Sequence, residues 1–220
     1  IRDYDSTFVQ VENGSDVRTT LDIDIQDIAE KALKNGIQGQ ENIDGGCAIV
    51  MDVKTGAIKA MVNLTLEADG SARERFNYAI GRADAPGSVF KTATLMTLLE
   101  DRKATLDTRV PTFKGKWSYN GVRLPDDPYL KTWKSDDISV REGLEISSNQ
   151  VFRYLVCTSY DKNPERFVNK LYEYGLGSTF DFDLTGFASP EIPMPGAPNW
   201  SGTTLPTIAY GYSIRETPLH

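Results

Sequence analysis

The sequence contains little histidine and little cysteine. Its one histidine, His220, is the last residue, and its two cysteines, Cys47 and Cys157, stand 110 residues apart. A single terminal histidine argues against a catalytic triad with a histidine base and against a zinc site. Two distant cysteines do not make a disulfide framework, so we expect two free, buried thiols. The cysteines therefore do not indicate whether the protein works in a reducing or an oxidising compartment. We predict neither a metal nor another cofactor.

The sequence also has no cluster of basic residues, no internal repeat and no long apolar run. Its 24 basic and 31 acidic residues give a net charge of −7, which makes nucleic acid an unfavourable partner. There is no signal peptide or membrane span, and the chain begins with isoleucine, so we expect a piece of a longer protein. With 220 residues, 40% of them hydrophobic, one domain with a sizeable core is expected.

The order of the predicted elements favours an α+β fold over a parallel βαβ array. We expect a linker from a preceding module at residues 1–18 and the folded domain at residues 19–220. The predicted elements are a helix from about residue 25 closed by Asn35-Gly36, a hairpin over 47–62, a buried helix over 88–100, and helices over 139–146, 149–157 and 164–174. Ser139 and Glu142 form a capping box at the start of the helix over 139–146, Gly175 ends the helix over 164–174, and Thr217-Pro218-Leu219 has the form of a further helix start. Residues 111–137 and 185–206 are expected to be mostly irregular, with a small hairpin at Asn120-Gly121.

One stretch combines a helix start with two reactive side chains. Pro86-Gly87 interrupts the chain before an apolar run, so Ser88 lies in the first turn, near unpaired N–H groups and the positive end of the helix dipole. Lys91 follows on the same face, within reach of the Ser88 hydroxyl. Because burial lowers the pKa of a lysine, Lys91 can act as the base that makes Ser88 a nucleophile.

A Ser-x-x-Lys pair also arises by chance in a chain of this size. Ser159 and Lys162 have the same spacing, but they stand in polar surroundings before Asn163-Pro164, which predicts a solvated loop lysine. A lysine inside an otherwise apolar helix is rare unless it is paired or used, and this difference favours Ser88 and Lys91.

A serine–lysine enzyme needs a second hydroxyl to relay the proton and an amide to hold the substrate. Ser147 and Asn149 flank a predicted helix break, so their side chains can point into one cleft. The alternative is that Ser148 or Asn149 only caps the next helix. Ser118-Tyr119-Asn120 has the same spacing, but the following Gly121 indicates a turn.

These motifs resemble the first two active-site motifs of penicillin-binding proteins, S-x-x-K and S-x-N. The likeness covers roughly residues 17–219, and it is carried by Thr20–Asp24, Ala48–Asp52, Gly56–Met61, Pro86–Lys91, Ser147–Asn149, Trp200–Pro206, Gly211-Tyr212 and Thr217–Leu219. It suggests class B proteins of the cell-division type more than β-lactamases. The implied α+β fold is the penicillin-binding/serine β-lactamase-like transpeptidase fold, an antiparallel sheet with flanking helices and a helical subdomain, here without its C-terminal strands.

The resemblance implies a D,D-transpeptidase that cross-links peptidoglycan stem peptides through a serine acyl-enzyme and is a target of β-lactams. By the same resemblance, Ser88 is the nucleophile and Lys91 its base, Ser147 passes a proton to the leaving nitrogen, and Asn149 binds the peptide and steadies Lys91. The implied partners are a glycosyltransferase and division proteins, and an anchor in the inner membrane would precede residue 1, leaving the domain periplasmic. A β-lactam sensor domain and a non-catalytic divisome scaffold are the alternatives.

The third motif of the family, Lys-Thr-Gly, does not stand where the resemblance requires it. Lys54-Thr55-Gly56 spells it but precedes Ser88, and we interpret it as a hairpin turn with a solvated lysine. The resemblance places the motif beyond His220, on a strand that supplies one of two oxyanion donors, the other being the Ser88 N–H. We therefore expect an open sheet edge and weak or no activity of this 220-residue chain. Ala85 and His220 replace the family's usual Glu and Gln, outside the reacting groups.

Overall fold

The computed structural model describes residues 12–179 and 184–220. Most of the predicted linker lies outside these residues, and residues 12–18 contain neither helix nor strand. The elements are α1 (Ile23–Ile37), β1 (Gly45–Met51), β2 (Ile58–Leu66), β3 (Ala72–Arg73), α2 (Tyr78–Gly81), η1 (Gly87–Phe90), α3 (Lys91–Glu100), β4 (Arg109–Pro111), η2 (Phe113–Gly115), β5 (Ser118–Tyr119), β6 (Val122–Arg123), α4 (Pro128–Lys131), β7 (Asp137–Ser139), α5 (Val140–Glu145), α6 (Asn149–Tyr160), α7 (Pro164–Glu173) and α8 (Thr204–Ile208).

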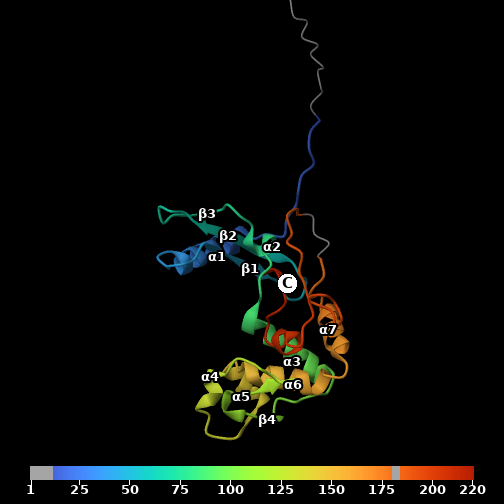
Figure 1. Cartoon of the computed structure of the whole chain (residues 1–220). Helices are drawn as coiled ribbons and strands as arrows, with labels where there is room; N and C mark the ends of the chain where they lie inside the picture. The colour runs from blue at the N-terminus through green and yellow to red at the C-terminus, as the bar shows by residue number, and fades with distance from the viewer. Residues whose placement is uncertain (1–11, 180–183) are drawn as a thin grey trace, which may run out of the picture.

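The elements form two lobes, which Figure 1 shows one above the other. We call α1 and β1–β3 the sheet lobe, and η1 through α8 the helical lobe. Segments 184–199 and 211–220 run between the two lobes. There the Ala188 N–H donates to the Ile80 carbonyl and the Leu219 N–H donates to the Ala79 carbonyl, so both segments lie against α2. A sheet with helices gathered apart from it is an α+β arrangement, as predicted.

The sheet lobe is a three-stranded antiparallel sheet in the order β1-β2-β3 with α1 against one face. Ala60, Val62 and Leu64 of β2 are buried under α1, two residues apart as the pleat requires. The predicted hairpin is confirmed, with Ala48 paired to Val62. Among the described strands, β1 pairs only with β2 and so leaves one edge of the sheet open.

Helix α1 extends slightly past its predicted end. The Asp22 side chain accepts from the N–H groups of Asp24 and Ile25 and begins the helix. The sequence predicts closure at Asn35-Gly36, but the helix continues through Gly36 to Ile37. Ile37 is buried in the small core beneath the sheet, and this burial outweighs the modest cost of one helical glycine.

The helical lobe is built around α3 and α6, which pack on each other and on α7 and α8. The predicted helix over 88–100 is present as η1 and α3, but it is not buried throughout. Phe90, Leu95 and Leu98 enter the core. In contrast, Val89, Met96 and Leu99 are 76%, 43% and 39% exposed. The prediction of a fully buried helix is therefore wrong on one face.

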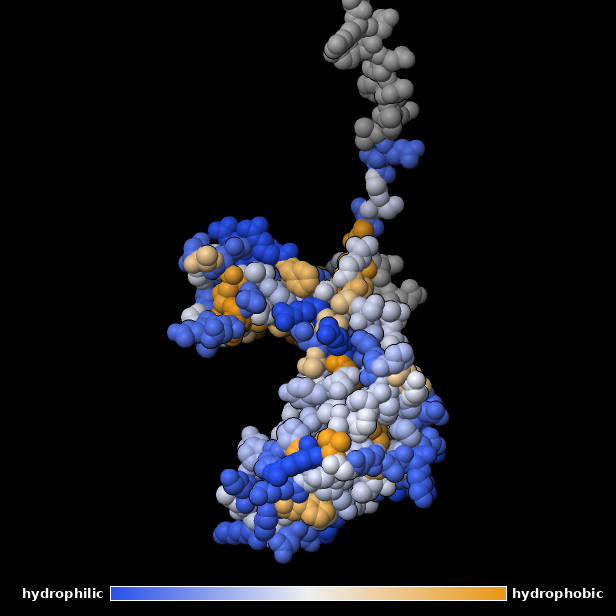
Figure 2. Space-filling view, viewed as in Figure 1, coloured by the Kyte–Doolittle hydropathy of each residue, from blue (hydrophilic) through white to orange (hydrophobic). Residues whose placement is uncertain are grey.

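That exposed face borders a cleft between the lobes. The cleft has a volume of about 850 Å³ and is lined by Gly45–Cys47 of β1, by Val89 and Met96, and by Thr217, Pro218 and His220. Figure 2 shows the molecule hollowed between the two lobes. The open edge of β1 and the apolar side chains of α3 thus face one another across unfilled space.

Several local predictions hold. Asn120-Gly121 turns the β5–β6 hairpin, with φ of 50° and 78°, and Gly175 follows α7 with φ of 88°. Residues 184–203 contain no helix. Thr217-Pro218-Leu219, predicted as a helix start, forms a turn in which His220 N–H bonds to the Thr217 carbonyl. Both cysteines are free, and Cys157 is buried as predicted, but the prediction of burial is wrong for Cys47, which is only half-buried because it lines the cleft. No helix within the described ranges has the length and apolarity to span a membrane.

Candidate active site

The start of α3 positions Ser88 and Lys91. Gly87 takes φ of 62°, a conformation open to glycine, and its N–H donates to the Gly211 carbonyl at 3.0 Å. Ser88 lies in the short 3₁₀ turn η1 and is exposed, whereas Lys91, the first residue of α3, is 1% exposed. The turn therefore presents a hydroxyl to solvent with an ammonium group beneath it.

The Lys91 ammonium group is surrounded by oxygen acceptors. Its Nζ lies 3.0 Å from Ser88 Oγ, 2.9 Å from Ser147 Oγ and 2.6 Å from the Ser147 carbonyl oxygen. These three contacts match the three protons of a charged lysine. Deprotonation of Lys91 would free a lone pair that can accept the Ser88 proton, with the Ser147 hydroxyl as the next group in line.

Burial lowers the pKa of Lys91 to about 8, chiefly because the charged form loses hydration, while the negative charge of Asp127 acts in the opposite direction. At pH 7 about a tenth of the Lys91 side chains are then neutral, against fewer than one in a thousand for an unperturbed lysine. The fraction able to take a proton rises as pH increases toward 8 and beyond. Lys91 therefore has a reactivity that an exposed lysine lacks near neutral pH.

Ser147 lies in a strained turn that ends α5. Its N–H donates to the Leu144 carbonyl and the Ser148 N–H to the Gly143 carbonyl, the pair of bonds that defines a Schellman motif. Glycine usually occupies the left-handed position of this motif, but here Ser147 takes it, with φ of 54°. A serine there costs about 1 kcal/mol relative to glycine. The turn aims both the carbonyl and the hydroxyl of Ser147 at Lys91.

Ser148 begins α6. Its Oγ accepts from the Val151 N–H at 3.3 Å and donates to Asp127 Oδ2 at 2.7 Å. The predicted alternative, that Ser148 caps the next helix, is therefore correct for Ser148, and it coexists with the contacts of Ser147 to Lys91. The break between the two helices both begins α6 and presents oxygen atoms to Lys91.

Asn149 is the first residue of α6 and is half-buried. Its side chain makes no hydrogen bond with any residue in the described ranges, so the expectation that Asn149 steadies Lys91 is not met in this structure. The oxygens of Ser147 hold Lys91 instead. The carboxamide of Asn149 is consequently available to another molecule.

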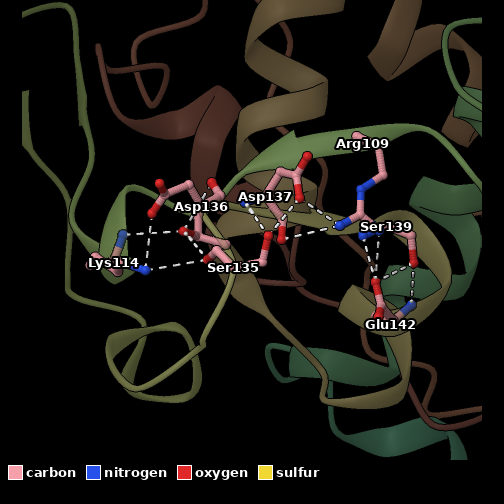
Figure 3. A network of polar contacts seen from close by, with 8 residues as sticks. Arg109, Lys114, Ser135, Asp136, Asp137, Ser139 and Glu142 are labelled. Carbon is pink, nitrogen blue, oxygen red and sulfur yellow. Dashed lines mark hydrogen bonds and ion pairs between the residues drawn. The ribbon is translucent and has the colours of Figure 1, made fainter.

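A polar network on the opposite end of α5 fixes where that helix begins. Ser139 and Glu142 form the predicted capping box, and Arg109 of β4 lies between Glu142 and Asp137, as Figure 3 shows. These side chains are about half-exposed, so each ion pair adds little stability. They join β4 to β7 and to the first turn of α5, the helix that leads to Ser147.

The two chance matches lie elsewhere. Lys162 is exposed after the end of α6, and Ser118-Tyr119-Asn120 forms part of the β5–β6 hairpin, both as predicted. Lys54-Thr55-Gly56 is the exposed tip between β1 and β2, where Gly56 takes φ of 70° and its N–H donates to the Asp52 carbonyl. None of these segments contacts Lys91 through a hydrogen bond.

Sequence reasoning missed two parts of the site. The Ser147 carbonyl makes the shortest contact to Lys91, and Asp127, in a segment predicted to be irregular, makes the hydrogen bond to Ser148. Asp127-Pro128 carried a usable signal, because an aspartate followed by proline marks the N-cap of a helix, here α4. The partner of its carboxylate had no signal in the local sequence.

The chain is similar to known proteins over nearly its whole length. The sequence model of the penicillin-binding protein transpeptidase domain matches residues 46–220. Stage V sporulation protein D of Bacillus subtilis is 26% identical over 94% of this chain. Peptidoglycan D,D-transpeptidase FtsI of Escherichia coli is 24% identical over all of it. The chain spans about a third of the length of these relatives, 32% and 36% respectively.

Solved structures agree on the fold. A peptidoglycan glycosyltransferase of Burkholderia ambifaria matches with a TM-score of 0.75 and 25% identity, over 91% of this chain and 57% of that one. Penicillin-binding protein 2B of Streptococcus pneumoniae matches with a TM-score of 0.74 and 22% identity, over 91% of this chain and 35% of that one. The predicted transpeptidase fold is thereby confirmed.

Proposed function

Since this chain belongs to the penicillin-binding protein transpeptidase domain family, we propose that it carries the acylation centre of a serine D,D-transpeptidase. The substrate would be the D-Ala-D-Ala end of a peptidoglycan stem peptide. One observation carries the proposal: the buried Lys91 Nζ lies 3.0 Å from the exposed Ser88 Oγ and 2.9 Å from Ser147 Oγ. A nucleophile, a base and a second hydroxyl in contact are what acyl transfer from an amide requires.

In the acylation step, Ser88 Oγ attacks the carbonyl carbon between the two D-Ala residues while neutral Lys91 takes the hydroxyl proton. Ser147 then passes a proton from Lys91 to the departing nitrogen, the C–N bond breaks, and D-Ala leaves. The free carboxamide of Asn149 is suited to hydrogen-bond the peptide backbone of the donor strand. The ester on Ser88 is finally resolved by the amine of a second stem peptide, which forms the cross-link.

The same centre would be acylated by β-lactams, whose strained amide replaces the peptide. By family resemblance we extend the proposal to residues 19–220 as the transpeptidase domain, to anchorage in the inner membrane ahead of it, and to a periplasmic location. A glycosyltransferase and division proteins are the proposed partners. The name of the FtsI relative, peptidoglycan D,D-transpeptidase, supports a role in building peptidoglycan.

Two functions of other classes would use the same fold. A β-lactam sensor would be acylated without turning over stem peptides, and a scaffold would not be acylated at all. The free carboxamide of Asn149 favours the enzyme over the sensor, because it offers a peptide-binding group. The proximity of Ser88, Lys91 and Ser147 favours the enzyme over the scaffold.

A fluorescent penicillin tests the proposal on the full-length protein. The wild type should take up one label, and Ser88→Ala should take up none. A wild type that stays unlabelled, or a label that persists in Ser88→Ala, would defeat the enzyme. Formation of cross-linked dimers from stem peptides separates the enzyme from the sensor.

We further propose that the 220-residue polypeptide labels weakly by itself. No Lys-Thr-Gly sequence follows Asn149 in it, and by resemblance that motif lies on the strand that gives the second oxyanion donor. Loss of one such donor costs about 3–4 kcal/mol in the transition state. Brisk labelling of the polypeptide would show that the second donor comes from within residues 1–220.

A further inference from the structure

A buried carboxylate lies behind the turn that carries Ser147 and Asn149. Asp127 is 2% exposed, and both of its carboxylate oxygens are used. Oδ2 accepts from the Ser148 hydroxyl at 2.7 Å and from the Gln150 N–H at 3.1 Å, and Oδ1 accepts from the Tyr129 N–H at 3.1 Å. The carboxylate therefore joins the start of α4 to the start of α6.

The backbone of Asp127 is fixed as firmly as its side chain. Its N–H donates to the Gly115 carbonyl at 2.9 Å. Gly115 packs so closely on it that a Cβ there would lie 2.2 Å from the Asp127 carbonyl oxygen, and Gly115 also takes φ of 78°. The backbone of Asp127 is thus fixed by Gly115, independently of the hydrogen bonds that its side chain makes to the turn at Ser147–Asn149.

A second buried residue of α6 completes the arrangement. Arg153 is 1% exposed, and its guanidinium donates to the Pro125 carbonyl at 2.7 Å and to Gln150 Oε1 at 3.2 Å. Gln150 in turn donates to the Thr112 carbonyl at 2.6 Å. The segment before Asp127 and the first turn of α6 are therefore tied together by groups that have no access to water, where each lost hydrogen bond is costly.

We propose that Asp127 is a positioning residue for acylation, which holds the Ser147–Asn149 turn against Lys91 through Ser148 and the Gln150 N–H. This inference rests on the proposed function. Asp127 contacts neither Ser88 nor Lys91 by a hydrogen bond, so its action passes through the turn and through its charge. Ser147 sits in a left-handed conformation that a serine adopts reluctantly, and such a turn keeps its shape only when the residues after it are held.

The charge of Asp127 gives a readout that a merely structural role would not move. The charged groups around it are Lys91 of α3 and Arg153 of α6, and its field raises the pKa of Lys91 while burial lowers that pKa. Replacement of the carboxylate by a neutral group removes the raising influence. The pH at which acylation reaches half of its plateau should then fall, because that midpoint follows the titration of Lys91.

The experiment measures the second-order rate constant of acylation by a fluorescent penicillin, from pH 6 to 10, on the full-length protein. Asp127→Asn should lower the plateau roughly ten- to a hundredfold, since an amide cannot accept from all three donors. It should also move the midpoint below the wild-type value near 8. Ser148→Ala removes one of the bonds and keeps the charge, so it should lower the plateau several-fold with an unchanged midpoint.

Asp126→Asn is the matched control. Asp126 is the exposed neighbour, paired at the surface with Arg123, so the same chemical change there should leave rate and midpoint at wild-type values. Wild-type rate and midpoint in folded Asp127→Asn would overturn the proposal. Should Asp127→Asn fail to fold, a wild-type rate in Ser148→Ala would overturn it equally. A wild type that never labels would defeat the proposed function, and this inference with it.

Discussion

The two lobes differ in what they hold in place. Every group that we propose to react, and Asp127 behind them, belongs to the helical lobe, and these groups come from the ends of buried helices. The sheet lobe supplies one wall of the cleft and an open strand edge at β1. The contacts of Lys91 with Ser88 and Ser147 therefore lie within the helical lobe alone.

The cores of the two lobes explain this division. The helical lobe has one large core in which α3 and α6 meet, whereas the core of the sheet lobe is a small cluster between α1 and β2. Hydrogen-bonding groups must be held to within about half an ångström to act in catalysis, and side chains packed on a large core meet that demand. The contact between Ser88 and Lys91 therefore rests on the large core of the helical lobe and not on the cleft wall formed by β1.

Two lysines, one in each lobe, test this division most directly. Lys91→Ala removes the base from the helical lobe, and the acylation rate should fall by two to four orders of magnitude. Lys54→Ala removes the exposed lysine of the Lys-Thr-Gly turn from the sheet lobe, and the rate should stay within twofold of wild type. Stopped-flow labelling with a fluorescent penicillin measures both. A large loss in Lys54→Ala would place chemistry in the sheet lobe and refute the division.

Two glycines test whether the division extends to backbone packing. A Cβ on Gly211 would lie 2.0 Å from the Gly87 carbonyl oxygen, at φ of 83°, so Gly211→Ala must displace the turn that carries Ser88. A Cβ on Gly45 would lie 2.4 Å from the Leu64 carbonyl oxygen, inside the sheet. In both variants the free energy of unfolding should fall by roughly 2–4 kcal/mol.

Only Gly211→Ala should also lose acylation at a temperature where both variants remain folded. A displacement of about 1 Å in a reacting group costs up to a hundredfold in rate. Gly45→Ala should react at close to the wild-type rate. Equal rate losses in the two variants would mean that the sheet lobe and the nucleophile turn are mechanically coupled.

The parts of this structure that the sequence predicted are those set by neighbours along the chain. The capping box at Ser139, the hairpin turn at Asn120-Gly121 and the Ser88–Lys91 pair each depend on residues within one helical turn or one hairpin. Such patterns can be recognised in a sequence because the interacting groups are only a few positions apart.

The parts that the sequence could not predict depend on groups that are distant along the chain. The bond from Ser148 to Asp127 spans 21 residues, and the bond from Lys91 to the Ser147 carbonyl spans 56. Every residue has a backbone carbonyl, so no sequence motif can indicate which carbonyl accepts the Lys91 hydrogen bond. The exposure of Val89 and Met96 was unpredictable for the same reason, because it depends on the distance between α3 and β1 across the cleft.

Ser147 allows a final, smaller test, in which stability and reactivity separate within the helical lobe. Ser147→Ala and Ser147→Gly both delete the hydroxyl that lies 2.9 Å from Lys91 Nζ, and both should slow acylation to a similar extent. They differ in the backbone, because alanine retains the strain at φ of 54° and glycine relieves it. Ser147→Gly should therefore be about 1 kcal/mol more stable than Ser147→Ala in thermal or urea unfolding. Equal stabilities would show that the turn relaxes once the hydroxyl is gone, and that the contact with Lys91, rather than the Schellman motif, imposes its left-handed conformation.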